Sequence, residues 1–309
     1  MPRIRKEGSL AEVRKLAEYE TIKQLHTEKG YPVQVMCEIL HVTRSAYYRW
    51  LKQPHSPREI RNNQIAEVAK QIYEEHDDKG YRRIRDDLEG IYGITISDNR
   101  ALRICRSQQI KSRIKHRANS ITKGAQKPYH IAENHLNRNF RADAPNEKWL
   151  TDVTEFKYYE GPEIKKVYLS AILDLYDRRI VAYIISDRND LPLVLQTFDA
   201  AIQKEPEAQP LFHSDRGFQY TSKKFCLRLE TAGMLQSMSR VARCIDNGPM
   251  EGFWALIKRE KYYRRKFTSR SSLVEMIHNY MEYYNNRRIQ RKLHIMTPME
   301  FHNHYFVAA

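Results

Sequence analysis

The change of residue pattern at Trp149 is the feature that most constrains how this chain can fold. Three strand-like stretches follow at hairpin spacing: "KWLTDVTEFKYY" alternates with a period of two, "KKVYLSAILDLYD" is almost continuously apolar, and "RRIVAYIIS" follows a tight turn. Helical patterns then alternate with the short apolar stretches "PLFHSD" and "MLQSMS". One of these helices, "TSKKFCLRLETAG", is expected to be capped by Thr221 and ended by Gly233. This order predicts an α/β domain in which helices cover a mixed sheet of five strands.

The first 130 residues have helical patterns and no alternating strand segment. Within them, residues 21–52 predict a helix ended by Gly30, a short second helix, and a third helix capped by Thr43. In the third helix, Ala46 and Trp50 are spaced to face the core. The outward side then carries side chains suited to DNA phosphates and base edges, namely Arg44, Ser45, Tyr48 and Arg49. This order of helices, with a basic and aromatic outer side on the third, predicts a DNA-binding helix-turn-helix. An ordinary three-helix bundle with a polar outer face is the alternative.

A second helical unit is expected at about residues 59–118, with Ile84 and Leu88 on one helix face and Ser97 or Asp98 capping a further helix. Residues 100–127 contain nine Lys and Arg and no Asp or Glu. An unbalanced positive field concentrates polyanions, so this stretch predicts contact with nucleic acid, and a disordered basic linker is the alternative. The candidate contacts are Arg100, Arg103, Arg106, Lys111, Arg113 and Lys115.

The composition excludes several classes of protein. The 309-residue chain has a net charge of +15, and its four cysteines include no CxxC pair. This spacing argues against a zinc knuckle and against a disulfide framework, and it fits a reducing compartment. No segment approaches about 18 apolar residues, and no apolar signal-peptide core follows the basic start. We therefore expect a cytoplasmic protein, associated with the nucleoid when bound to DNA, that has no membrane partner.

Three acids in the second half of the chain are placed so that they would meet. Asp152 lies in the middle of the first strand, where an acid is unfavourable unless something compensates it. Asp215 ends the strand that follows the first crossover helix, and such a strand often lies beside the first one. Glu251 lies in the first turn of the helix beginning near Pro249. Converging acids repel one another unless divalent cations neutralise them, and Mg²⁺ prefers such oxygen ligands. The alternative is that Asp215 is a turn residue and Glu251 a helix N-terminal acid.

Five motifs in order go beyond that alternative: "WLTDVTEF", "AILDLYDRRIVAY", "HSDRGFQYTS", "SMSR…CIDNGPMEGFWALIKRE" and "YNNRRIQRKLHIMTPMEF". Together they resemble the larger-frame transposase of the bacterial insertion-sequence family IS3, whose members are DDE recombinases with retroviral integrase-like cores. The resemblance covers about residues 145–305 and includes the 35-residue gap between Asp215 and Glu251 that is typical of the family. The helical half is similar through "VMCEILHVTRSAYYRW" and "KGYRRIRDDL".

The resemblance implies a ribonuclease H-like α/β catalytic core with a mixed five-stranded sheet and flanking helices, preceded by α-helical helix-turn-helix modules. It divides the chain into an N-terminal helix-turn-helix region (1–57), a second helical, basic module (58–125), a connector (126–145) and a catalytic domain with C-terminal helices (146–309). The implied activity is Mg²⁺-dependent cleavage of 3′ ends followed by strand transfer, with two ions per site and Mn²⁺ as a substitute.

The resemblance also assigns roles to single residues. The implied catalytic and metal-binding residues are Asp152, Asp215 and Glu251. Lys258 lies two helical turns after Glu251 and is interpreted as a ligand of a DNA phosphate, with a plain surface lysine as the alternative. Residues interpreted as site-shaping or DNA-contacting are His213, Gln219, Tyr220 and Asn247.

The chain departs from the family pattern at three places, none of which removes an implied metal ligand. Val241-Ala242-Arg243 stands where Lys-Gly-Asn is common, Gly248 replaces a usual alanine, and "EGFW" replaces "ESFF" or "ENFF". The first departure removes a glycine after Arg240, and we expect it to change a loop near the DNA.

The implied partners are double-stranded DNA, as terminal inverted repeats and target DNA, and further copies of the chain on that DNA. Residues 8–29 are too short and irregular for a zipper of three or more heptads, which leaves open a partner supplied by an upstream reading frame. Two alternative functions also remain open at this point. One is a non-catalytic DNA-binding regulator of transposition, and the other is a ribonuclease H-type nuclease that acts on RNA–DNA hybrids.

Overall fold

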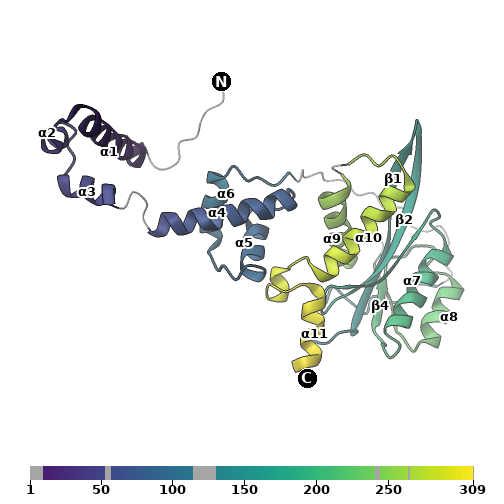
Figure 1. Ribbon diagram of the computed structural model, residues 1–309. Helices are drawn as coiled ribbons and strands as arrows, with labels where there is room; N and C mark the ends of the chain where they lie inside the picture. Colours follow the sequence, from purple (N-terminus) through teal and green to yellow (C-terminus); the bar gives the residue numbers. More distant parts are fainter. Residues whose placement is uncertain (1–9, 53–56, 114–129, 241–243, 264, 309) are drawn as a thin grey trace. The chain divides into compact units, whose positions relative to one another are not determined.

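The computed structural model describes residues 10–52, 57–113, 130–240, 244–263 and 265–308 (Figure 1). The chain forms two compact units, Met1–Arg113 and Ile114–Ala309. Residues 53–56, the candidate contact Lys115 and the departure at residues 241–243 lie outside the described residues. Among the helices described, none is both long enough and apolar enough to cross a membrane.

The first unit begins with three helices, α1 (Leu10–Lys29), α2 (Val33–Ile39) and α3 (Arg44–Lys52). Gly30 ends α1 with a φ of +70°, a left-handed conformation that favours glycine. Thr43 caps α3 as predicted, because its hydroxyl oxygen accepts a hydrogen bond from the Ala46 backbone N–H at 3.4 Å. Trp50 packs against the core of the three helices as predicted, although it is only half-buried. The fully buried residue of α3 is Tyr47, which was not predicted.

Three further helices follow in this unit, α4 (Pro57–Glu75), α5 (Tyr81–Gly90) and α6 (Asp98–Ser107). Ile84 and Leu88 are buried in their shared core, as the helical spacing predicted. The predicted capping by Ser97 is confirmed, because its side chain accepts a hydrogen bond from the backbone N–H at the third position of α6. A buried ion pair between Lys79 and Asp87, with 2.6 Å between Nζ and Oδ2, joins the segment just before α5 to the second turn of that helix.

The second unit contains the predicted mixed sheet of five strands. They are β1 (Lys148–Glu160), β2 (Glu163–Asp174), β3 (Ile180–Ser186), β4 (Leu211–Ser214) and β5 (Gln236–Met238). Their order across the sheet is β3-β2-β1-β4-β5. The first three strands pair antiparallel, whereas β4 runs parallel to both β1 and β5. The strand after the first crossover helix therefore lies beside β1, as predicted.

Helices cover both faces of this sheet (Figure 1). One core contains Trp149 of β1 with residues of α7 (Leu191–Lys204) and α8 (Lys223–Thr231). The opposite core contains Leu150 of β1 with residues of α9 (Gly248–Ile257) and α10 (Arg270–Asn286). Successive strand residues point to opposite faces, so each side of β1 has its own core. The last helix, α11 (Pro298–Ala308), was not predicted, and α8 is capped by Ser222 instead of Thr221.

The segment at residues 130–145, within the predicted connector, has no helix or strand but packs on the second unit. Leu136 is buried in the sheet core, and its backbone N–H donates a hydrogen bond to Ser237 Oγ at 3.1 Å. The backbone carbonyl of Glu133 accepts from the N–H of Met238. Arg138 Nε donates to Asp246 Oδ1 at 2.6 Å, and this contact ties the segment to the turn that precedes α9. This part of the predicted connector is therefore held against β5.

A short π-helical turn, η2 (Lys258–Tyr262), continues α9 and is held by a buried ion pair. Glu260 accepts hydrogen bonds from Arg288 Nη2 at 2.9 Å and from the Tyr280 hydroxyl at 3.0 Å. Glu260 and Arg288 are only 3% and 8% exposed. Because a buried charge is costly without its partner, this pair constrains the path of the chain beyond α9.

Substitution of Glu260 by Ala is expected to destabilise the second unit by about 3–5 kcal/mol, because it leaves Arg288 buried without its counter-ion. The measurement is urea unfolding of Glu260→Ala beside Glu275→Ala, an exposed acid on α10 whose loss should cost less than about 0.5 kcal/mol. The double variant Glu260→Gln, Arg288→Met should recover most of the loss, since it removes both charges. Equal stability of the two single variants would contradict the structural role given to this pair.

Candidate active site

The register between β1 and β4 sets two of the predicted acids side by side. Leu150 pairs with His213 in this parallel ladder. Asp152 and Asp215 each follow two residues later, with Asp215 one residue beyond the end of β4. Because both acids follow a paired position by the same two residues, they are level with each other at this end of the sheet. Neighbouring strands lie about 4.8 Å apart, so the two residues are also close.

The two carboxylates disfavour each other's ionisation. Burial and then repulsion from Asp215 raise the pKa of Asp152 to about 7, and a smaller contribution comes from Glu251. The Val153 N–H and the Trp254 indole N–H, which both donate to Asp152, act in the opposite direction. Burial also raises the pKa of Asp215, against the effect of the Gly217 N–H that donates to its Oδ1 at 2.8 Å. This arrangement is a pair of hard oxygen donors whose repulsion a divalent cation would relieve.

Glu251 approaches from α9, whose first turn contains it as predicted. The start of this helix is tied to β1, because Asn247 Nδ2 donates to the backbone carbonyl of Thr151 at 3.1 Å. Burial raises the pKa of Glu251. In the part of the chain that the structure describes, no three acidic, histidine or cysteine side chains are grouped closely enough to hold a metal ion. The structure thus brings together the aspartate pair, and joint ligation by all three acids stays a prediction.

The four residues expected to shape the site are all buried, which favours shaping over contact with DNA. Tyr220 lies with its hydroxyl 3.2 Å from Thr151 Oγ1, and burial together with the two aspartates raises its pKa well above the usual value. His213 bridges Ser237 and Ser239, and burial lowers its pKa to about 4, so the ring is neutral near pH 7. The side chains of Gln219 and Asn247 are only 4% exposed. These residues therefore form the packed surroundings of the acids.

Lys258 lies on the same side as the acids. It is the first residue of η2, and its Nζ lies 5.3 Å from the centroid of the Phe156 ring. Burial lowers the pKa of Lys258, while Asp152 and Glu155 act to raise it. A lysine that is half-buried and interacts with the central acid differs from the plain surface lysine that was the alternative. Its contact with a DNA phosphate stays a prediction.

Sequence reasoning missed two residues that touch the aspartates. Trp254 Nε1 donates a hydrogen bond to Asp152 Oδ2 at 3.0 Å. Its only signal in the sequence was the unusual "EGFW". Gly217 lies against the carboxylate, since a Cβ there would lie 2.9 Å from Asp215 Oδ1 and 3.0 Å from Gln219 Oε1 and would displace these side-chain ends. By contrast, the departure at Gly248 is sterically mild, because a Cβ there would meet its nearest neighbour at 4.0 Å.

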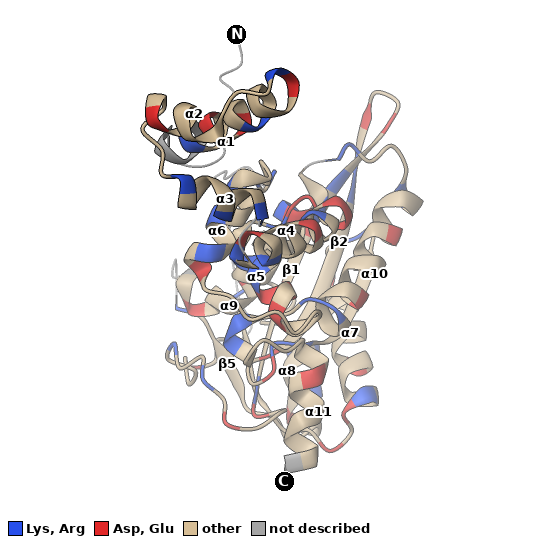
Figure 2. Ribbon diagram, turned by 60° about the vertical axis from the view of Figure 1, so that its left-hand side comes forward, with Lys and Arg blue, Asp and Glu red and all other residues tan. Residues whose placement is uncertain are grey.

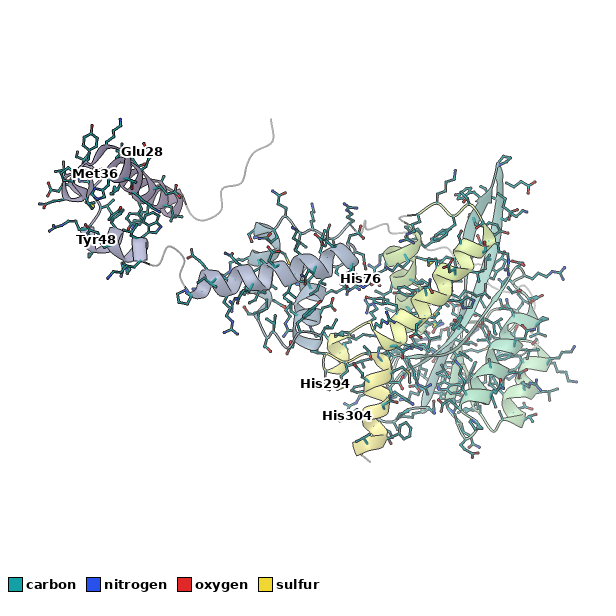
Figure 3. The ribbon with its side chains drawn as sticks, in the orientation of Figure 1. Glu28, Met36, Tyr48, His76, His294 and His304 are labelled. Carbon is teal, nitrogen blue, oxygen red and sulfur yellow. The ribbon has the colours of Figure 1, made fainter. Side chains whose placement is uncertain are left out.

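The candidate DNA contacts in the first unit are mostly exposed. Arg44, Tyr48 and Arg49 are exposed on α3; Figure 2 colours the Lys and Arg residues of this helix blue, and Figure 3 labels Tyr48. Exposed candidates in and after α6 are Arg103, Arg106, Lys111 and Arg113. Arg113 forms an ion pair with Asp77 across 3.2 Å but is still 68% exposed. Arg100 differs from them, because its guanidinium donates twice to Asn62 Oδ1, at 3.0 and 2.8 Å, within the helical unit.

Family models match most of the chain. The integrase core domain matches residues 142–244 and again residues 251–306, and an HTH-like domain matches residues 60–118. A mixed sheet with paired aspartates, in a chain that matches the integrase core, defines a polynucleotidyl transferase of the DDE class. Enzymes of this class depend on divalent metal ions, and the HTH-like and integrase core domains indicate that the chain binds DNA.

Comparison with individual proteins identifies the family. InsK of Escherichia coli, named for insertion sequence element IS150, is 34% identical over 90% of this chain and 95% of its own length. The 31 kDa protein of insertion element IS600 from Shigella sonnei is 30% identical over 87% of this chain and 98% of its own length. The HTLV-2 integrase catalytic core, solved in complex with magnesium, is 20% identical with a TM-score of 0.41, over 52% of this chain and 99% of that chain. The chain belongs to the IS3 family of insertion-sequence transposases, which confirms the predicted family and the class of DDE transposase.

Replacing Gly217 by Ala is expected to lower DNA cleavage by about tenfold to a hundredfold, because the added methyl group displaces the Asp215 carboxylate. The matched control is Gly252→Ala in α9, where a Cβ meets nothing within 4 Å. That control should keep full activity and gain up to about 1 kcal/mol of stability from its helix propensity. Cleavage rates of the two variants at saturating metal make the comparison. Loss of activity in both variants, or in neither, would argue against the steric role of Gly217.

In metal-free protein, Asp152→Asn is expected to stabilise the second unit by about 4 kcal/mol near pH 8. The folded pKa of Asp152 is raised to about 7, above the ordinary value of about 4. Below about pH 4 the carboxyl is protonated in both states, so the substitution changes little there. Between about pH 4 and pH 7 only the unfolded chain ionises, and the wild-type protein loses stability as the pH rises.

Urea unfolding in EDTA across this pH range measures the effect. Asp143→Asn, which removes a carboxylate that is 80% exposed, is the matched control and should change stability little at any pH. A stability difference between Asp152→Asn and wild type that does not grow with pH would contradict the assigned pKa.

Proposed function

We propose that this chain cleaves the 3′ ends of its own insertion sequence and joins them to target DNA, with two Mg²⁺ ions, or Mn²⁺ in their place. The observation that carries this proposal is the level placement of Asp152 and Asp215 on adjacent strands, where burial and mutual repulsion raise the pKa of Asp152. When bound, such ions activate the attacking oxygen and stabilise the leaving oxygen of an in-line displacement at phosphorus.

The chain's own residues then have separate tasks. Asp152 and Asp215 hold the cations from the sheet, and Glu251 completes the ligand set from α9. Lys258 binds a phosphate next to the reacting bond, and the support for this is its place on the side of the acids, with its Nζ 5.3 Å from the centroid of the Phe156 ring. The neutral, buried ring of His213 joins β4 to Ser237 of β5 and to Ser239 just after it, so it keeps the strand that precedes Asp215 rigid. Rigid surroundings of this kind keep the ligands in the geometry that the reaction requires.

We further propose that the substrates are the terminal inverted repeats and a target duplex, bound by more than one copy of the chain. The exposed side chains of Arg44, Tyr48 and Arg49 on α3 support recognition of duplex DNA, because this pattern suits phosphates and base edges. The exposed basic residues Arg103, Arg106 and Lys111 would add phosphate contacts. The match to relatives named for insertion sequences supports the choice of substrate. Arg100 is left out of this surface, because Asn62 already binds its guanidinium.

The test uses the purified chain, labelled duplexes that carry element ends, and Mg²⁺ or Mn²⁺. Asp152→Asn and Asp215→Asn should each reduce both cleavage and joining by about a thousandfold or more, because they remove metal ligands that stabilise transition-state charge. Asp199→Asn, which removes a surface carboxylate paired with Arg228, should keep full activity. The double variant Arg44→Ala, Arg49→Ala should lose DNA affinity and show a smaller dependence on salt.

Two outcomes would reject this proposal. Wild-type protein that binds end DNA but gives the same products as Asp152→Asn would be a regulator without chemistry. Protein that cuts the RNA strand of hybrids in preference to duplex ends would be a ribonuclease H-type nuclease.

A further inference from the structure

Each oxygen of the Asp152 carboxylate accepts a hydrogen bond from a defined donor. Oδ1 accepts from the backbone N–H of Val153 at 2.8 Å, and Oδ2 accepts from the indole N–H of Trp254 at 3.0 Å. The first donor belongs to the same strand and moves with Asp152. The second belongs to α9, so it fixes the carboxylate relative to a different element.

Trp254 is itself held firmly in place. It is 6% exposed and lies in the core between α9 and the sheet, with its ring centroid 5.1 Å from that of Phe253. A buried indole N–H needs an acceptor, because an unpaired donor away from water costs free energy. Asp152 is the acceptor that this indole has found. The rigid, buried ring of Trp254 therefore links the core to Oδ2 of Asp152.

Trp254 lies on the same helix as two other residues of the candidate site. Trp254 lies three residues after Glu251 and four residues before Lys258, so the three side chains share one face of the helix. The same face therefore carries an acid, an N–H donor and an ammonium toward β1. Rotation or sliding of α9 that moved Glu251 would also break the bond from Trp254 to Asp152.

We infer that Trp254 is a positioning residue for the metal site, which orients the Asp152 carboxylate for a divalent cation and sets the distance between the strand with Asp152 and the helix with Glu251. The inference rests on the proposed metal-dependent function. A carboxylate oxygen has two lone pairs, so Oδ2 can accept from the indole and still coordinate a cation. Phenylalanine, which is common at this position in the resembling motif, has no N–H and would leave the oxygen without this donor.

The chain supplies a matched control for the loss of one indole N–H. Trp149 lies on the same strand as Asp152 but faces the opposite core. Its indole N–H donates to Asn146 Oδ1 at 3.2 Å and to Asp174 Oδ2 at 3.3 Å. Trp149→Phe thus removes a comparable buried bond to a carboxylate three residues before Asp152, on the opposite face of the sheet.

The experiment measures Mn²⁺ affinity of the full chain without DNA, by the electron paramagnetic resonance signal of free Mn²⁺, together with thermal unfolding. Trp254→Phe is expected to weaken Mn²⁺ binding by about tenfold or more, the usual effect of losing a hydrogen bond to a metal ligand. Trp149→Phe should lower the melting temperature but leave Mn²⁺ affinity within about twofold of wild type, because it does not touch the site. A purely structural role of Trp254 would change the melting temperature alone.

A second variant protects the test against misfolding. Benzothienylalanine at position 254 keeps the bicyclic shape and replaces the N–H by sulfur, so it should fold as wild type and still bind Mn²⁺ about tenfold more weakly. Wild-type affinity in this variant would overturn the inference while leaving the metal site intact. The proposed metal site predicts that wild type binds Mn²⁺ and that Asp152→Asn abolishes this binding. If wild type does not bind Mn²⁺, or if Asp152→Asn binds it equally well, the proposed metal site is rejected, and the inference with it.

Discussion

Repulsion between Asp152 and Asp215 is the constraint on which the rest of this structure depends. The parallel register of β1 and β4 sets the two carboxylates level in a place where burial already disfavours charge. The chain cannot relieve the repulsion by a one-residue slip, because that would turn every β1 side chain toward the wrong core. Leu150, which is fully buried and pairs with His213 two residues before the acids, therefore holds this register.

The neighbours of this pair fix its orientation more than they neutralise its charge. The N–H groups of Gly217 and Trp254 each bind one carboxylate, and Asn247 ties the start of α9 to β1. These donors are neutral, and Lys258 is a half-buried cation whose pKa Asp152 acts to raise. Neutral donors leave the negative charge available, so the site stays a favourable place for a cation. The buried negative charges therefore destabilise the metal-free fold, but they form a pair of ligands that is already in place for a cation.

Features with a local cause could be predicted from the sequence. Strand alternation gave the two faces of β1, and Asp152 stood out because an acid does not belong in such a strand. Features that depend on contacts between distant segments could not be predicted. The core role of Tyr47 depends on how three helices pack, and the bond from Arg100 to Asn62 joins residues 38 positions apart. The indole of Trp254 meets Asp152 across 102 positions, which no periodicity in the sequence could show.

The π-helical turn after α9 connects the buried core to the chemistry. Helical spacing places Glu251 and Trp254 on one face, but Lys258 opens the wider turn of η2. Because such turns insert an extra residue into the helical path, the anchor beyond it decides where the ammonium lies. That anchor is the bond from Arg288 to Glu260, buried on the side of α10. Two buried interactions therefore fix this helix relative to the aspartates. One is the hydrogen bond from Trp254 to Asp152, and the other is the ion pair between Arg288 and Glu260.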